Sequence, residues 1–155
     1  MKLEGREIPD GGEVADMGYY RETTVDLPYD ETVAKVRDAL AEQGFGVLTE
    51  IDVKDTMRKK LDHDMEEYVI LGACNPQLAR RALDVDRAIG VLLPCNVVVS
   101  KTDRGTNVKI LDPAVMSDLS GLYDLRGIAD EASTRLDAVL ATLAGGADGA
   151  AARPA

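Results

Sequence analysis

Apolar and polar residues alternate in several short segments of the chain, which is the pattern of half-buried β-strands. In one of these segments Phe45, Val47 and Thr49 fall on the same face. Another, residues 67–74, is apolar on both faces, which predicts a central strand. The alternation predicts five strands, at residues 19–27, 45–51, 67–74, 90–101 and 106–111.

Apolar residues at three- and four-residue spacing predict helices between and after these strands, at residues 31–43, 53–61, 76–85 and 122–143. The second helix would bury Val53, Met57 and Leu61 along one stripe. The third would begin with Asn75 as its N-cap and Pro76 in the first turn, where the ring is already set for helix.

The order of elements is strand, helix, four further strands with short helical excursions, and a long final helix. This order predicts an α+β fold, a two-layer sandwich of one mostly antiparallel sheet with helices on one face. Residues 1–17 are polar and Gly-rich, and we expect a mobile N-terminal arm there. Residues 144–155 have low complexity and predict a disordered C-terminal tail. A single domain is expected over 18–143.

Composition narrows the function classes. The chain has 155 residues, with 18 Lys and Arg against 28 Asp and Glu, and a net charge of -10. This balance argues against a nucleic-acid partner, which favours a basic patch. No apolar run approaches the roughly 20 residues that span a bilayer, and the N-terminus lacks the apolar core of a signal peptide. We therefore expect a cytoplasmic protein without a membrane partner, whose thiols are kept reduced.

Two short motifs hold the only two cysteines, Cys74 and Cys95. Each cysteine is followed by an asparagine, Asn75 or Asn96, and each pair lies where an apolar segment meets a proline. These four residues are the candidate ligand-binding site, and the two cysteines are the candidate catalytic residues.

The chemistry of each cysteine has a functional and a structural interpretation. Cys74 precedes a helix N-terminus, where the dipole can lower a thiol pKa or attract an anion. Alternatively it is a small buried side chain that fills a strand end, beside Asn75 as a cap. Cys95 follows Pro94, which predicts a bulge or a sheet edge, and bulges occur both near functional sites and at ordinary edges. Asn96 would then satisfy backbone groups that the bulge leaves free.

The two cysteines could also act as a pair. A disulfide requires Cα atoms about 4.4–6.8 Å apart, and the sequence leaves open whether the two strands are neighbours. Two thiolates are half of a zinc ligand set, but His63, the only histidine, lies in a polar link and the cysteines are 21 residues apart. We therefore predict no metal site. No catalytic triad, phosphate-binding loop or dinucleotide fingerprint is present.

Several segments in consistent order resemble the domain of unknown function 302 family: 45–47, 51–54, 71–76, 90–97 and 112–113. The resemblance covers about residues 19–143. It implies a TATA-binding-protein-like α+β fold, in the order strand, helix, four strands, helix. It carries no DNA-binding residues onto this acidic chain. The family is described as small bacterial and archaeal proteins without an established activity, so the resemblance implies a fold and no reaction.

The leading hypothesis is a non-enzymatic homodimeric binding module that takes a small ligand or a partner near the two Cys-Asn motifs. The dimer is expected because the predicted sheet has two apolar faces and helices enough to cover one. The alternative is a thiol redox protein or thiol-dependent enzyme, with Cys74 as nucleophile and Cys95 as resolving partner. A purely structural role for the cysteines is the third possibility. The sequence identifies no cofactor, ligand or reaction.

Overall fold

The computed structural model describes residues 2–3, 6–7 and 13–145, and its main feature is a six-stranded antiparallel sheet in the order β3-β4-β8-β7-β6-β5. The strands of this sheet are β3 (Ala15–Asp16), β4 (Tyr20–Val25), β5 (Gly46–Asp52), β6 (Tyr68–Cys74), β7 (Cys95–Thr102) and β8 (Gly105–Leu111). Two further strands, β1 (Lys2–Leu3) and β2 (Arg6–Glu7), pair with each other.

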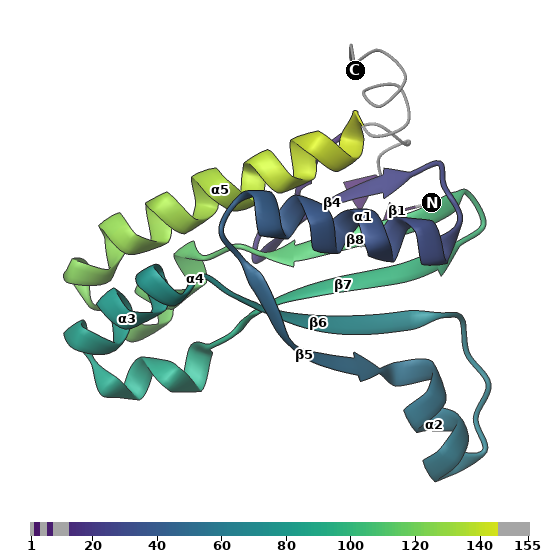
Figure 1. Cartoon of the computed structure of the whole chain (residues 1–155), viewed down its shortest axis with the longest axis horizontal. Coiled ribbons are helices and arrows are strands. Elements are labelled where there is room, and N and C mark those ends of the chain that lie inside the picture. Colours follow the sequence, from purple (N-terminus) through teal and green to yellow (C-terminus); the bar gives the residue numbers. More distant parts are fainter. Residues whose placement is uncertain (1, 4–5, 8–12, 146–155) are drawn as a thin grey trace.

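All of the described helices except α2 pack on one face of this sheet or at one of its ends (Figure 1). The helices are α1 (Tyr29–Glu42), α2 (Val53–Leu61), α3 (Pro76–Val85), α4 (Ala114–Ser120) and α5 (Arg126–Ala144), with 3-10 turns η1 (Arg87–Leu92) and η2 (Tyr123–Leu125). Helices α1 and α5 cross the sheet side by side, α3 and α4 gather at one end, and α2 stands away at the other (Figure 1). The predicted α+β two-layer fold is therefore confirmed.

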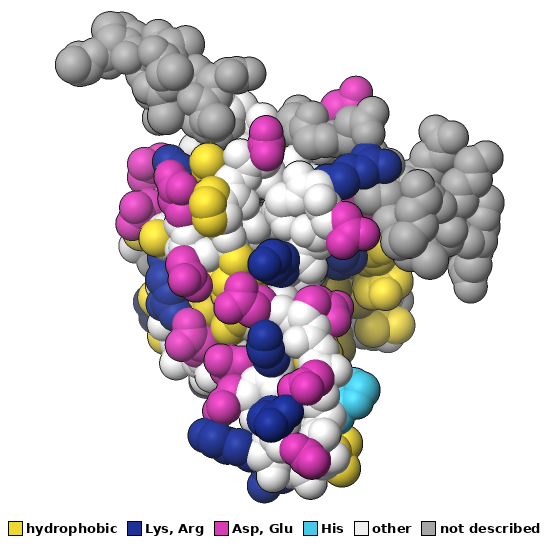
Figure 2. All heavy atoms as spheres, turned by 90° about the vertical axis from the view of Figure 1, so that its right-hand side faces the viewer, with side chains coloured by type: hydrophobic (Ala, Val, Ile, Leu, Met, Phe, Trp, Pro, Cys, Tyr) yellow, Lys and Arg dark blue, Asp and Glu magenta, His cyan; other side chains and the backbone are white. Residues whose placement is uncertain are grey.

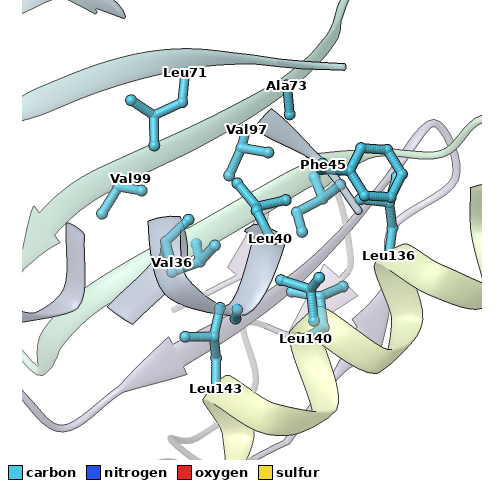
Figure 3. Packing of buried hydrophobic residues seen from close by; sticks show 14 of the residues in the cluster. Val36, Leu40, Phe45, Leu71, Ala73, Val97, Val99, Leu136, Leu140 and Leu143 are labelled. Carbon is cyan, nitrogen blue, oxygen red and sulfur yellow. The ribbon is translucent and has the colours of Figure 1, made fainter. Parts of the chain in front are cut away.

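The main core lies between the sheet and the helices α1 and α5. Val36 and Leu40 of α1 and Leu140 of α5 point toward Val97 and Val99 of β7 (Figure 3), and each of the five is at most 1% exposed. Full burial of an aliphatic side chain of this size contributes about 1.5–3 kcal/mol. The apolar stripes of the two helices thus hold both helices against one face of the sheet.

A second apolar cluster joins α3, η1, α4 and the first turns of α5 beside the ends of β6 and β7. Its buried members are Leu78, Ala82, Ile89, Met116, Leu125, Ile128 and Ala132. This cluster places a wall of helices at the sheet end where both Cys-Asn motifs lie.

The predicted fourth strand begins later than expected. Strand β7 begins at Cys95, while residues 87–92, which were expected to include its first residues, form η1. The side chain of Asp86 accepts a hydrogen bond from the Ala88 backbone N–H at 3.0 Å and so caps this turn. Pro94 was expected to mark a bulge or a sheet edge, but it lies just before β7, an interior strand whose ladder with β6 is regular from Cys95 onward. The sheet's irregularity lies instead in β5, between Val47 and Thr49.

Helix α2 forms where it was predicted, but its expected burial is wrong. Val53 and Met57 are only half-buried, and Leu61 is 70% exposed. The reason is that α2 follows β5, an edge strand, and extends past the sheet instead of lying across it (Figure 1). Local bonds support it, including a 2.9 Å hydrogen bond from the Asp55 backbone N–H to the side chain of Asp52.

The last predicted helix is shorter than expected, because α5 begins at Arg126 and not at residue 122. A helix that the apolar pattern did not indicate, α4, precedes it and ends at Gly121, whose φ of 70° lies in the left-handed region that glycine tolerates. Strand β6 pairs on both sides, but it is second from the sheet edge rather than central, and no described helix covers its second face.

The expected terminal segments are only partly described. Within the predicted N-terminal arm, β3 pairs with β4 through Ala15 and Glu22. Residue 1, residues 4–5 and residues 8–12 of that arm lie outside the described residues, as do residues 146–155 of the predicted tail.

Candidate functional site

The pairing of β6 with β7 brings the two cysteines together. Ala73 lies directly opposite Cys95, so Cys74 is one position along the neighbouring strand from the partner of Cys95. Both thiols are free in this structure. The adjacency that the sequence left open is thus decided by the register of two antiparallel strands joined through α3 and η1.

Asn75 has a defined structural role. Its side-chain Oδ1 accepts a hydrogen bond from the backbone N–H of Leu78 at 3.2 Å, and Pro76 follows as the first residue of α3. This confirms the predicted N-cap. Asn75 is only 9% exposed, and its amide packs beside Gly44, where an added Cβ would lie 3.1 Å from Nδ2. The side chain is therefore held in place as part of the wall of the site.

Asn96 does not join the other three candidates. It lies opposite Gly72, and it is exposed between the buried residues Cys95 and Val97. Because side chains alternate along a strand, Asn96 points to the sheet face away from the helices. The structure thus brings Cys74, Asn75 and Cys95 together and places Asn96 elsewhere.

The three grouped residues line a small cavity between the sheet end and the helical cluster. Its volume is about 30 Å³, which exceeds the roughly 10–15 Å³ that a cavity needs to hold one water molecule. Most of the other lining residues are apolar: Phe45, Ala73, Leu78, Ala79, Ala82, Leu93, Met116, Ile128 and Ala132. The cavity accordingly suits a small apolar group.

Burial decides the protonation of both thiols. It raises the pKa of Cys95 to about 11, and the charge of Cys74 nearby adds to the rise. Burial likewise raises the pKa of Cys74, which is less deeply buried. The shift in the Cys74 pKa is therefore opposite to the lowering that the nucleophile hypothesis required. Both thiols are therefore protonated at neutral pH.

The described residues bear on three further kinds of function: metal binding, membrane insertion and binding to nucleic acid. Across 2–3, 6–7 and 13–145, no three His, Cys, Asp or Glu side chains gather as a metal ligand set would. None of the helices in those ranges has the length and apolar character needed to cross a bilayer. On the face shown in Figure 2, Lys and Arg side chains are interspersed with Asp and Glu and form no continuous basic patch.

A second cavity, which the sequence did not indicate, lies against strands β4, β7 and β8 and the hairpin that joins β7 to β8. Its volume is about 310 Å³, and its lining includes Glu22, Ser100, Asn107 and Lys109. The local signals were ionisable residues among the β-branched residues of two strands, Glu22 in one and Lys109 in the other. Such signals do not tell a buried charge from a solvent-facing one.

The six-stranded antiparallel sheet with helices on one face defines a small α+β domain, and its cysteine site combines a buried thiol, Cys95, with a partly buried one, Cys74. Residues 21–143 match the family described as "Domain of unknown function DUF302", so the chain belongs to this family. Its fold is similar to the crystal structure of an uncharacterised conserved DUF302 protein from Bacillus stearothermophilus, with a TM-score of 0.76 and 29% sequence identity. The match covers 81% of this chain and 98% of that one. No curated protein matches the chain.

Proposed function

We propose that the protein is a non-enzymatic binding module, whose apolar cavity at Cys74, Asn75 and Cys95 receives a small apolar group of a ligand or partner. The observation that carries this proposal is that two thiols, both kept protonated by burial, line one apolar cavity. A protonated thiol is a poor nucleophile, but it packs as a small apolar group. The site therefore suits binding better than covalent chemistry.

Xenon is a suitable probe, because dry apolar cavities of small size admit it. We expect xenon pressure to shift the backbone amide resonances around Cys74 and Cys95 in two-dimensional NMR spectra. Ala79→Val adds two methyl groups at the cavity lining and should abolish these shifts. Ala41→Val makes the same change at an exposed position of α1 and should preserve them. If xenon leaves the amides at the cavity unchanged in the natural sequence, the proposal is refuted.

We further propose that the module is a homodimer formed through the sheet face that no described helix covers. Ile51, Ile70 and Val98 lie directly opposite one another on β5, β6 and β7 and form an apolar row on that face. Ile51 is 49% exposed, and the other two are partly exposed. A second copy that presents the same row would bury it by a two-fold contact.

Analytical ultracentrifugation at micromolar concentration tests the dimer. Ile70→Glu should produce monomers, because it would place a charge in the proposed contact. Val91→Glu is the control, since Val91 is 86% exposed on η1 and lies outside the row. A monomer in the natural sequence would refute the dimer while leaving the cavity proposal in place.

The thiol redox protein remains the second candidate, because Cys74 and Cys95 lie one register step apart on paired strands. It requires at least one thiol that reacts quickly with a disulfide reagent in the folded protein at neutral pH. The binding module requires slow reaction of both thiols until the protein is denatured. A fast-reacting Cys74 whose reactivity disappears in Cys74→Ser would favour the redox candidate.

A further inference from the structure

Several charged residues line the second cavity, and two of them, one acidic and one basic, face each other across two paired strands. Glu22 on β4 lies directly opposite Lys109 on β8, and Thr24 lies directly opposite Asn107. All four residues line the cavity of about 310 Å³. Side chains at directly opposed positions point to the same sheet face, so the four form one polar cluster on the face away from α1 and α5.

Glu22 is buried to an extent that is unusual for a carboxylate, since its side chain is only 3% exposed. The Asn107 Nδ2 donates to Glu22 Oε1 at 2.9 Å and to Thr24 Oγ1 at 3.2 Å. Asn107 therefore fixes the carboxylate in one orientation beneath the cavity.

The ion pair that balances Glu22 is loose. Lys109 Nζ lies 3.6 Å from Glu22 Oε1, longer than a charge-assisted hydrogen bond, and it donates instead to Asn107 Oδ1. Lys109 is also 37% exposed, so its ammonium group can be reached from solvent. A carboxylate has about four acceptor positions and an ammonium three donors. Glu22 can thus accept a further hydrogen bond from a cationic group, and Lys109 can donate one to an anionic group.

We propose that this cavity binds a free α-amino acid, with its α-ammonium group on Glu22 and its α-carboxylate on Lys109. An α-amino acid carries both charges on one carbon, so it needs an acid and a base a few ångströms apart, as Glu22 and Lys109 are. Ser100 and Thr24 place hydroxyl groups in the same lining. A volume of about 310 Å³ is at the lower end of small-molecule sites and suits a ligand of this size.

Charge balance explains why a zwitterion is favoured over a ligand with one charge. A lone carboxylate would draw Lys109 away and leave Glu22 buried without a balancing charge, which is strongly unfavourable. A lone amine would leave an excess positive charge beside Lys109. A zwitterion adds one charge of each sign, so each member of the pair gains a partner. This site is separate from the thiol cavity and does not depend on the function proposed there.

The test is an NMR titration of the full chain with each standard α-amino acid up to about 10 mM. The side-chain amide of Asn107 is the reporter. We expect at least one amino acid to shift this resonance saturably. The deaminated and the decarboxylated analogue of that amino acid should each bind at least tenfold more weakly. The proposal is overturned if no amino acid binds, or if either analogue binds as well as the amino acid.

Variants locate the site. Glu22→Gln and Lys109→Gln should each weaken binding of the amino acid by at least tenfold. Glu42→Gln, at an exposed position of α1, and Cys74→Ser, in the other cavity, should leave its affinity unchanged. Because Glu22 is buried, we expect its variant to lose stability, so circular dichroism must show that each variant is folded. The partly exposed Lys109 provides the decisive variant. Unchanged affinity in folded Lys109→Gln would overturn the assignment.

Discussion

Gly72 is the position where one added methyl group should disturb the cysteine site most directly. A Cβ there would lie 2.2 Å from Thr49 Oγ1 and 2.9 Å from Pro94 Cγ. Both distances are shorter than real Cβ contacts allow, so the side chain of Thr49 and the ring of Pro94 must both move. Pro94 immediately precedes Cys95, and movement there would be passed to the first residue of β7.

We expect Gly72→Ala to destabilise the protein by about 1–3 kcal/mol, the usual cost of overpacking. Urea denaturation measures this as a lower midpoint with an unchanged slope. Gly46→Ala is the matched control, because it lies at the start of β5 and an added Cβ meets nothing within 4 Å. We expect Gly46→Ala to change stability by less than about 1 kcal/mol.

A second variant identifies the contact that causes the loss. Thr49→Ala removes the Oγ1 atom, so the nearest remaining atom of residue 49 is Cβ, at 3.5 Å from the added methyl and in ordinary contact. The contact with Pro94 Cγ at 2.9 Å remains. Part of the loss should therefore be recovered in Gly72→Ala with Thr49→Ala, as a coupling energy in a double-mutant cycle. The reasoning is refuted if Gly72→Ala is as stable as the natural sequence, or if Gly46→Ala loses as much stability.

Four further predictions follow from burial and hydrogen bonding. Asn75→Ala should cost about 0.5–2 kcal/mol in urea denaturation, because it removes the cap of α3, and Asn75→Asp should retain most of that stability. Burial raises the pKa of Cys95 to about 11 from an ordinary 9.0, so its protonated thiol favours the folded state below pH 9. This contribution to the free energy of unfolding, on the order of 2–3 kcal/mol, should be lost as pH rises from 9 toward 11. Cys95→Ala should flatten that part of the profile of stability against pH. Thr23→Val should raise the melting temperature, because the buried Thr23 hydroxyl has no hydrogen-bond partner in the described part of the chain; a lower melting temperature would contradict this. Leu40→Ala should cost about 2–5 kcal/mol, and Leu61→Ala, at a 70% exposed position, almost nothing; equal losses would show that α2 is packed in solution.

Much of the fold could be predicted from local patterns. Alternation located most of β5, β6 and β8, and Asn75 with Pro76 marked the first turn of α3 because capping depends on a few adjacent residues. Burial was less predictable. The apolar spacing of α2 resembles a buried stripe, but its exposure follows from the edge position of β5, which no local pattern reports.

The candidate site was predictable only in part, because its chemistry depends on neighbours. The sequence singled out Cys74 and Cys95, and the helix N-terminus suggested a lowered thiol pKa. The structure reverses this direction for Cys74, because burial raises the pKa of its thiol, as it also raises that of Cys95. Asn96 was included because its motif repeats that of Asn75, but strand alternation places it on the opposite sheet face. The polar cavity was missed because its residues are far apart in the chain.

The types and order of most of the main elements can be read from the sequence alone, because helix and strand periodicity, caps and turns are local to a few residues. The position of Cys95 opposite Ala73 and that of Glu22 opposite Lys109 follow from the folded sheet and from no local pattern. Strand register joins residues far apart in the chain, and the packing of both faces selects it. The same packing decided which sheet face the helices cover, and hence how deeply each thiol is buried and on which face Glu22 and Lys109 lie.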